Sequence, residues 1–164
     1  VAVRRQRQMC IRDSIYIIKN SEVPLGIEFD NFLWIRSRLN EKQMNKAAKK
    51  LLGEQDFSSF RASGCQSKSV IRRIYKANVT RKGNYLIFEV TANAFLLNMI
   101  RIIVGTLIKV GKNEITPEDF ENIIKKRDRK LAGRTIEAKG LYFVGPEYNN
   151  LDYKVNKVFV NELD

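Results

Sequence analysis

A single arginine lies within the most apolar segment of this chain. Between Glu89 and Lys109 the only ionisable side chain is Arg101, inside the stretch NAFLLNMIRIIVGTLIKVG, residues 93–111. A guanidinium binds a carboxylate or a phosphate through paired hydrogen bonds, and it stays charged at physiological pH. The type and setting of Arg101 therefore point to chemistry more directly than those of any other residue.

A helical period fits residues 95–110 and sorts their side chains onto two faces. Most of them form a broad apolar face. A narrow stripe on the opposite side holds residues at spacings of three, four and four: Asn98, Arg101, Gly105 and Lys109. Gly105 follows Arg101 by one turn and leaves room for another segment to approach.

Two interpretations of Arg101 are open. In the first, an ordinary core helix lets the guanidinium extend to solvent along its aliphatic stem. In the second, the helix is covered on both sides and the guanidinium needs an anionic partner, because an unpaired buried charge costs about 3–5 kcal/mol. Asp56 and Glu89 are candidate partners, and nothing in the sequence selects either. The partner can also come from a segment outside this sequence.

Charge and residue content restrict the classes of function. The 164 residues carry a formal net charge of +12, which favours an anionic partner, nucleic acid or a membrane surface, over a merely solvated basic surface. The chain has no histidine, which removes the commonest metal ligand and the usual proton shuttle near neutral pH. Cys10 and Cys65 are too few for a zinc site, and we expect no disulfide between them.

Two segments have some features of membrane or targeting sequences. Residues 93–111 are long enough to span a membrane, but their asparagines and Arg101 exclude a transmembrane helix. Residues 1–14, VAVRRQRQMCIRDS, lack the apolar core of a secretory signal and are similar to translated sequencing-adapter sequence. We expect residues 1–14 to be foreign and residues 15–164 to form the domain. Removing the four arginines and one aspartate of residues 1–14 lowers the charge from +12 to +9, so the basic character is retained.

The residue patterns predict an α/β (α+β) fold, with a largely antiparallel mixed sheet flanked by helices. The expected strands are 15–20, 32–36, 70–80, 85–92, 141–148 and 152–160. The strands 70–80 and 85–92 form a hairpin with these candidate inward positions: Ile71, Ile74, Leu86, Phe88 and Val90. Residues 54–69 show no period and are expected to be a loop.

Three helices are expected. The first begins at Asn40, with Gln43 completing a capping-box pattern, and stops at Gly53. The second runs from about residue 94 to 110. The third opens at Thr116, followed by Pro117 and two acidic residues, and buries Phe120, Ile123 and Ile124.

Three long motifs, in order, resemble the C-terminal half of the TruA family of tRNA pseudouridine synthases. They are GEQDFSSFRASGCQSKSVIRRI, NAFLLNMIRIIVGTLIKVG and LAGRTIEAKGLYFV, and weaker similarity runs from Ile15 onward. The resemblance implies a pseudouridine synthase-like fold and isomerisation of uridine in the anticodon stem-loop of tRNA. It also implies a cytoplasmic homodimer that uses no metal and no cofactor.

The resemblance gives Arg101 a role: the family's arginine in this motif pairs with a nucleophilic aspartate. That aspartate belongs to a motif like G-R-T-D-x-G-V-H, which this sequence lacks, since Gly133-Arg134-Thr135 is followed by Ile136. We therefore expect the nucleophile-bearing half to have been lost, most simply by truncation of the gene model, and the remaining chain to be inactive. In the family's Y-x-Y-x-I pattern, Tyr16 matches the second tyrosine, and the base-contacting first one falls at Ser14.

Basic and aromatic residues between 54 and 73 are candidates for the RNA-binding surface. The candidate substrate-binding residues are Tyr16, Phe60, Arg61, Gln66, Lys68, Arg72 and Asn98. For Arg61 and Lys68 we favour RNA contact. For Phe57 and Phe60 a role as core anchors is favoured over base stacking, and Cys65 is expected to be a packed side chain. The basic run 125–130 is more typical of a solvated helix end than of a tRNA contact.

Two alternatives to a synthase fragment are open. One is a stand-alone, non-catalytic RNA-binding module derived from such an enzyme. The other is a basic structural or protein-interaction domain. A folded fragment with salt-dependent RNA affinity favours the RNA-binding module, whereas an exposed apolar face favours part of a larger enzyme.

Overall fold

The computed structural model describes residues 11–24, 26 and 30–147. In chain order its strands and helices are β1 Ile11–Asn20, β2 Leu33–Ile35, α1 Glu41–Lys49, β3 Gly53–Asp56, β4 Ile71–Lys82, β5 Tyr85–Ala92, α2 Met99–Gly111, α3 Pro117–Lys126 and β6 Leu141–Glu147. Short 3-10 turns lie at Ser58–Phe60, Arg129–Leu131 and Ala138–Gly140. None of the described helices is long and apolar enough to cross a membrane.

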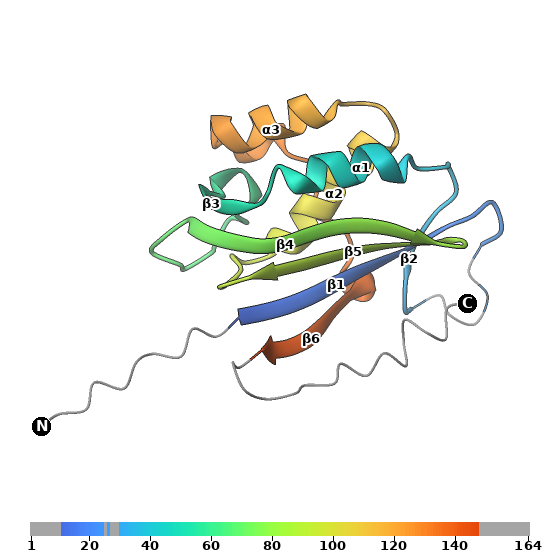
Figure 1. Cartoon of the computed structure of the whole chain (residues 1–164), viewed down its shortest axis with the longest axis horizontal. Helices are drawn as coiled ribbons and strands as arrows, with labels where there is room; N and C mark the ends of the chain where they lie inside the picture. The colour runs from blue at the N-terminus through green and yellow to red at the C-terminus, as the bar shows by residue number, and fades with distance from the viewer. Residues whose placement is uncertain (1–10, 25, 27–29, 148–164) are drawn as a thin grey trace, which may run out of the picture.

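The strands form one mixed sheet with β1 near its centre. One side of β1 pairs antiparallel with β5, and β4 and β3 follow beyond it. The other side is shared: β6 pairs antiparallel with residues 11–16, and β2 pairs parallel with residues 18–20. Figure 1 shows α1, α2 and α3 together on one face of this sheet. The expected α+β fold, with a largely antiparallel mixed sheet, is confirmed.

The main core lies between the helices and the sheet. Alternation along β1 places Tyr16 and Ile18 in this core. Ile17 points to the opposite face, where it packs with Phe32 in a smaller cluster. The apolar segment 99–111 is buried along nearly its whole length because α2 is the helix enclosed by the other elements.

The ends of α1 and α3 follow the predicted capping chemistry. The Asn40 side chain accepts a hydrogen bond from the Gln43 amide, although α1 ends at Lys49, before Gly53. At the start of α3, Thr116 and Asp119 form a reciprocal capping box. These bonds satisfy backbone N–H groups that have no partner within the helix.

The helix α2 begins at Met99, five residues later than predicted. Asn98 adopts a left-handed conformation, with φ of 57°, which an α-helix cannot continue through but which asparagine tolerates. Just before it, the Asn93 side chain accepts hydrogen bonds from the amides of Arg73 and Ala94. Phe95 and Leu96 therefore belong to a loop, and the wheel applied to them was wrong.

Two strand predictions also need correction. The edge strand β3, Gly53–Asp56, takes in Gly53, expected to stop the first helix, and the first three residues of the expected loop 54–69. Its polar sequence gives no alternation signal because it pairs through its backbone at an exposed edge. Ile71 is 44% exposed, whereas Ile74 is buried, since residues three apart lie on opposite faces of a strand. The predicted strand 152–160 lies outside the described residues.

The strand β1 starts within the segment expected to be foreign. Residues 12–14 pair with both β5 and β6, Ile11 pairs with β6, and Thr91 donates a hydrogen bond to the Asp13 carboxylate. Ser14 is fully buried. We still propose that residues 1–14 are foreign in origin, with the last four serving as part of a strand whose pairing depends on backbone groups.

Candidate active site around Arg101

Arg101 lies in the first turn of α2 and is half-buried. Its Nε donates to the backbone oxygen of Ile136 over 2.6 Å, and its Nη1 donates to Oδ1 of Asn98 over 3.1 Å. Both acceptors are neutral. Because a guanidinium has five N–H donors, three of them have no acceptor among the described residues.

The left-handed turn at Asn98 places this residue beside Arg101. The Asn98 side chain makes no capping bond to the helix backbone, and its amide oxygen instead holds the guanidinium. Asn98 thus joins the candidate site as predicted by the spacing, but through a turn residue rather than through a helical stripe.

A crossing segment, residues 133–136, packs against the middle of α2. A Cβ added to Gly105 would lie 2.1 Å from the backbone oxygen of Arg134, and one added to Gly133 would lie 2.6 Å from the carbonyl carbon of Gly105. The Thr106 hydroxyl accepts a hydrogen bond from the Gly133 amide over 2.8 Å. The prediction that Gly105 admits another segment is confirmed, and this segment supplies the Ile136 carbonyl that orients Arg101.

Tyr16 lies beneath this crossing segment. Its hydroxyl donates to the backbone oxygen of Glu137 over 2.5 Å, and the side chain has no exposed surface. Burial, with a smaller contribution from the Glu137 charge, raises the pKa of the Tyr16 hydroxyl, and the nearby Arg101 charge partly opposes this rise. Tyr16 therefore lies next to Arg101 and packs beneath the site. Because its side chain has no exposed surface, it presents none to a bound ligand.

A cavity of about 380 Å³ opens beside Arg101. Its walls are mostly apolar, and Arg101 and Arg12 are the charged groups that line it. Two wall residues are strongly exposed, Leu97 at 51% and Phe143 at 71%. An arginine facing a mostly apolar cavity can bind a carboxylate there and stabilise its ionised form.

The two carboxylates proposed as internal partners of Arg101 bind other residues. Asp56 forms an ion pair with Arg127 at 3.5 Å, and Glu89 pairs with Lys76 at 2.5 Å. No ion pair joins Arg101 to a carboxylate within residues 11–24, 26 and 30–147. Among these residues, no cluster of three or more acidic, histidine or cysteine side chains is placed to hold a metal ion.

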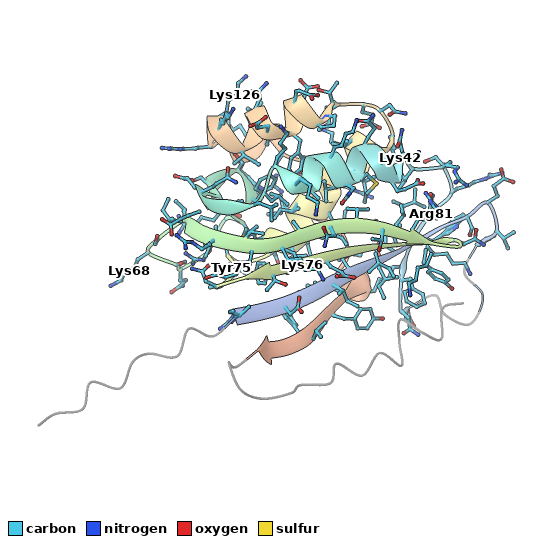
Figure 2. The ribbon with its side chains drawn as sticks, in the orientation of Figure 1. Lys42, Lys68, Tyr75, Lys76, Arg81 and Lys126 are labelled. Atoms are coloured by element: carbon cyan, nitrogen blue, oxygen red, sulfur yellow. The ribbon has the colours of Figure 1, made fainter. Side chains whose placement is uncertain are left out.

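The candidate RNA-binding residues of the 61–72 loop divide into two groups. Lys68 and Gln66 are exposed, and Figure 2 shows Lys68 projecting from the loop before β4. Arg61 donates to the carbonyls of Cys65 and Ser67, and Arg72 donates to the Ser67 hydroxyl and to two nearby carbonyls. The two arginines therefore hold the loop in its conformation and also contribute positive charge to it.

Phe60 is placed in the core. Its side chain has no exposed surface and stacks on Phe120 at 5.8 Å between ring centroids, while Phe57 is equally buried. The favoured core interpretation is confirmed, and a base-stacking role for Phe60 is wrong because both rings are enclosed. Cys65 is half-buried and packs against the same core; backbone hydrogen bonds from Leu97 and Ser67 hold the pKa of its thiol below the usual range.

A second, larger cavity of about 940 Å³ is bordered by the crossing segment and the C-terminal half of α2, and no sequence pattern predicted it. Five basic residues line it: Arg36, Arg38, Lys109, Lys112 and Arg134. They come from three distant parts of the chain, so no local run of charge marks them. The only sequence signal was the position of Lys109 on the same helical stripe as Arg101.

Comparison with known proteins identifies the family. A family model described as tRNA pseudouridine synthase matches residues 47–149. The chain is 45% identical over 139 residues to tRNA pseudouridine synthase A of Francisella philomiragia, and 46% identical over 139 residues to that of Francisella tularensis subsp. novicida. Each match covers 85% of this chain and 54% of the relative, so the chain spans about half the length of the curated relatives it matches. The chain belongs to the tRNA pseudouridine synthase family.

Proposed function

We propose that this chain supplies the active-site arginine and part of the RNA-binding surface of a tRNA pseudouridine synthase. The observation that carries the proposal is Arg101 itself. It is held by two neutral acceptors, faces an apolar cavity, and has no carboxylate partner among the described residues. The family and the names of the relatives supply the reaction class and tRNA as the substrate.

In the proposed reaction, the bond from ribose C1′ to N1 of uracil breaks and a bond from C1′ to C5 forms. The C5 proton is lost and N1 gains a proton, so the product is an isomer. The target base must leave its stack to be reached. Arg101 would pair with an aspartate nucleophile from a segment outside these 164 residues and keep it ionised.

The cavity next to Arg101 suits this role. Its apolar walls, including Leu97 and Phe143, would exclude water from the arginine–carboxylate pair and strengthen the attraction between the two charges. The exposure of these two walls also favours part of a larger enzyme over a stand-alone RNA-binding module. Hydrodynamic size and binding of an apolar dye would separate these two candidates.

Tritium release from uridine-labelled anticodon-arm RNA tests the proposal. We expect no release by the 164-residue chain alone, and release when the N-terminal half of the Francisella philomiragia relative is added. In that mixture Arg101→Ala should lower the rate at least about 100-fold, since an uncompensated carboxylate in this setting costs about 3–5 kcal/mol. Lys46→Ala, at an exposed position on α1, is the control.

Two outcomes would contradict the proposal. Turnover by the chain alone would show that the nucleophile is not supplied from elsewhere. An Arg101→Ala mixture as active as the Lys46→Ala mixture would remove Arg101 from the mechanism.

The same proposal includes a homodimer in the cytoplasm, which rests on the resemblance to the family. Sedimentation of the reconstituted mixture would test the dimer.

A further inference from the structure

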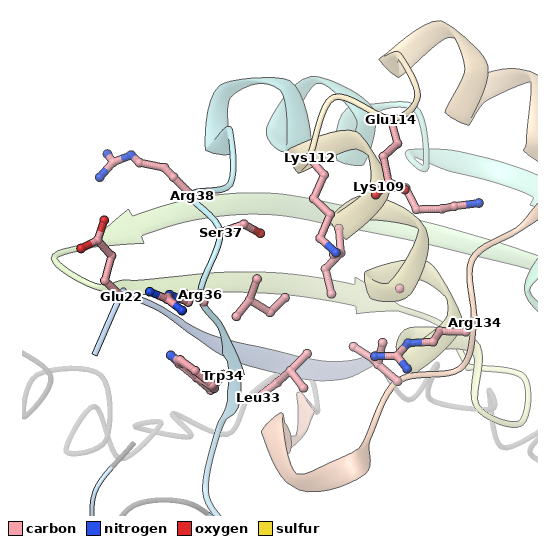
Figure 3. A pocket seen from close by; sticks show the side chains of 14 residues that line it. Glu22, Leu33, Trp34, Arg36, Ser37, Arg38, Lys109, Lys112, Glu114 and Arg134 are labelled. Atoms are coloured by element: carbon pink, nitrogen blue, oxygen red, sulfur yellow. The ribbon is translucent and has the colours of Figure 1, made fainter. Parts of the chain in front are cut away.

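A groove bordered by the crossing segment carries charge that the Arg101 site does not use. We call it the basic groove and define it by Arg36, Arg38, Lys109, Lys112 and Arg134. Figure 3 shows Lys112 on the α2 side of the hollow and Arg36 on the β2 side. Glu22 and Glu114 also line it, so the formal surplus is five positive charges less two, or three.

The charges of the basic groove are largely uncommitted. Within the described part of the chain, Arg36, Lys109, Lys112 and Arg134 have no ion pair and no side-chain hydrogen bond, whereas Arg38 lies in the field of Glu41. Such a group of like charges is costly in a folded chain unless counterions or an anionic ligand neutralise it. The groove therefore differs from a set of cations that stabilise the fold.

The second basic cavity of the molecule provides the contrast. It has a volume of about 500 Å³ and is lined by Arg61, Arg127 and Arg129. Each of these guanidiniums is already bonded within the protein: Arg61 to loop carbonyls, Arg127 to Asp56, and Arg129 to the Gly133 carbonyl and a threonine hydroxyl. Of these two cavities, the basic groove has more lysine and arginine side chains without a bonded partner among the described residues.

The basic groove and the Arg101 site share structural elements. Lys109 follows Arg101 by eight residues on α2, a rise of about 12 Å along the helix axis. Arg134 belongs to the crossing segment whose Ile136 carbonyl orients Arg101. A polynucleotide with one base at Arg101 could therefore pass over the crossing segment, which covers α2 at Gly105, and reach the groove within a few nucleotides.

We propose that the basic groove binds the sugar–phosphate backbone of RNA beside the reacting nucleotide. This inference rests on the proposed function and adds to it a second contact surface. Lysine and arginine donors on both walls match a chain of phosphates, and the groove is open enough for a polymer to pass.

The lining of the groove favours RNA over an acidic peptide. Leu33, Ile35 and Ile108 provide an apolar lining for the less polar parts of nucleotides. The indole N–H of the half-buried Trp34 is already bonded to the Ser21 carbonyl at 2.9 Å, so the ring is fixed and offers mainly its apolar surface. A polynucleotide presents both phosphates and flat base faces, and a polyglutamate chain presents carboxylates without such faces.

The test measures binding of fluorescein-labelled tRNA to the 164-residue chain by anisotropy across a salt series. The groove variant is Arg36→Glu/Lys112→Glu, which changes one exposed residue on each wall. The matched variant Lys46→Glu/Lys126→Glu makes the same charge change at two exposed helix positions outside the described cavities. Arg36→Gln/Lys112→Gln is measured in addition, because it removes the charges without introducing new acidic groups.

The groove variant should weaken tRNA binding at least about tenfold more than the matched variant does, and the slope of log affinity against log salt should fall by about two. Equal weakening by the two glutamate variants would overturn the groove and leave the proposed function standing. Competition by polyglutamate as strong as that by RNA of equal charge would overturn RNA as the ligand. Failure of the wild-type chain to bind tRNA better than single-stranded DNA of the same length would count against both proposals.

Discussion

Gly105 is the residue whose substitution tests the packing around Arg101 most directly. Alanine stabilises an exposed helix interior by about 1 kcal/mol relative to glycine. Helix propensity alone therefore predicts that Gly105→Ala is stabilising. The structure predicts the opposite sign, because the added methyl group would meet the crossing segment rather than open space.

The size of the effect follows from the distances. The new Cβ would lie 2.1 Å from the Arg134 oxygen, which is 1.3 Å short of the 3.4 Å at which ordinary contact begins. The obstacle is backbone, so it cannot rotate away, and overpacking of this kind costs about 1–3 kcal/mol. Moving the crossing segment outward also weakens the bond from Arg101 to Ile136, and a hydrogen bond to a charged group is worth about 1.5–3 kcal/mol. After subtraction of the propensity gain of about 1 kcal/mol, we expect a net loss of about 1.5–5 kcal/mol.

Urea and thermal unfolding measure this loss. For a chain of this length, the expected loss lowers Tm by about 3–20 °C, at about 2–4 °C for each kcal/mol. Gly26→Ala is the control, since a Cβ at Gly26 meets no atom of the described residues within 4 Å, and replacing a glycine that has no steric constraint is neutral or slightly stabilising. A Gly105→Ala protein that is as stable as wild type, or more stable, would refute the close approach of residues 133–136 to α2.

Three further changes test other parts of the structure. Thr106→Val should destabilise the fold by about 1–3 kcal/mol in urea unfolding, because the buried Gly133 amide loses its acceptor. Hydrogen bonds from the Thr116 backbone and hydroxyl hold the pKa of Asp119 below its usual range, so the stability it contributes is present above about pH 4 and is lost as the pH falls further; Asp119→Asn should flatten the fall of Tm with acidification. Tyr16→Phe should lower stability by about 1–2 kcal/mol and remove the tyrosine whose ionisation at high pH is delayed, which alkaline absorbance titration would detect.

The local signals in the sequence predicted the starts of α1 and α3 well. Thr116 and Asp119 form their box within four residues, and such a pattern depends on no other part of the chain. The predicted start of α2 was wrong because it depends on a backbone conformation that no local residue pattern marks. The apolar residues after Asn93 suit a helix, and a left-handed Asn98 is needed to end the loop that connects it to β5. A wheel projection has no means to detect one residue with positive φ.

The sequence predicted which side chains belong to the candidate site, but only part of how they are arranged. Arg101 and Asn98 are neighbours because they are three residues apart, which the sequence shows directly. The Ile136 carbonyl that holds Arg101 is 35 residues away, and a backbone acceptor has no residue type that marks it. The basic groove was not predicted either, because its charges come from three separate parts of the chain: the β2–α1 connection, the end of α2 and the crossing segment.

The crossing segment, residues 133–136, contributes to both the Arg101 site and the basic groove. Its Ile136 carbonyl orients Arg101, which lines one cavity, and its Arg134 lines the basic groove. A change that displaces the segment, such as Gly133→Ala, should therefore disturb both surfaces. Changes at Arg36 and Lys112 should disturb only the groove, because neither residue contacts the Arg101 cavity. The difference between these two kinds of variant separates loss of RNA contact from loss of arginine positioning, which a substitution in the segment alone cannot do.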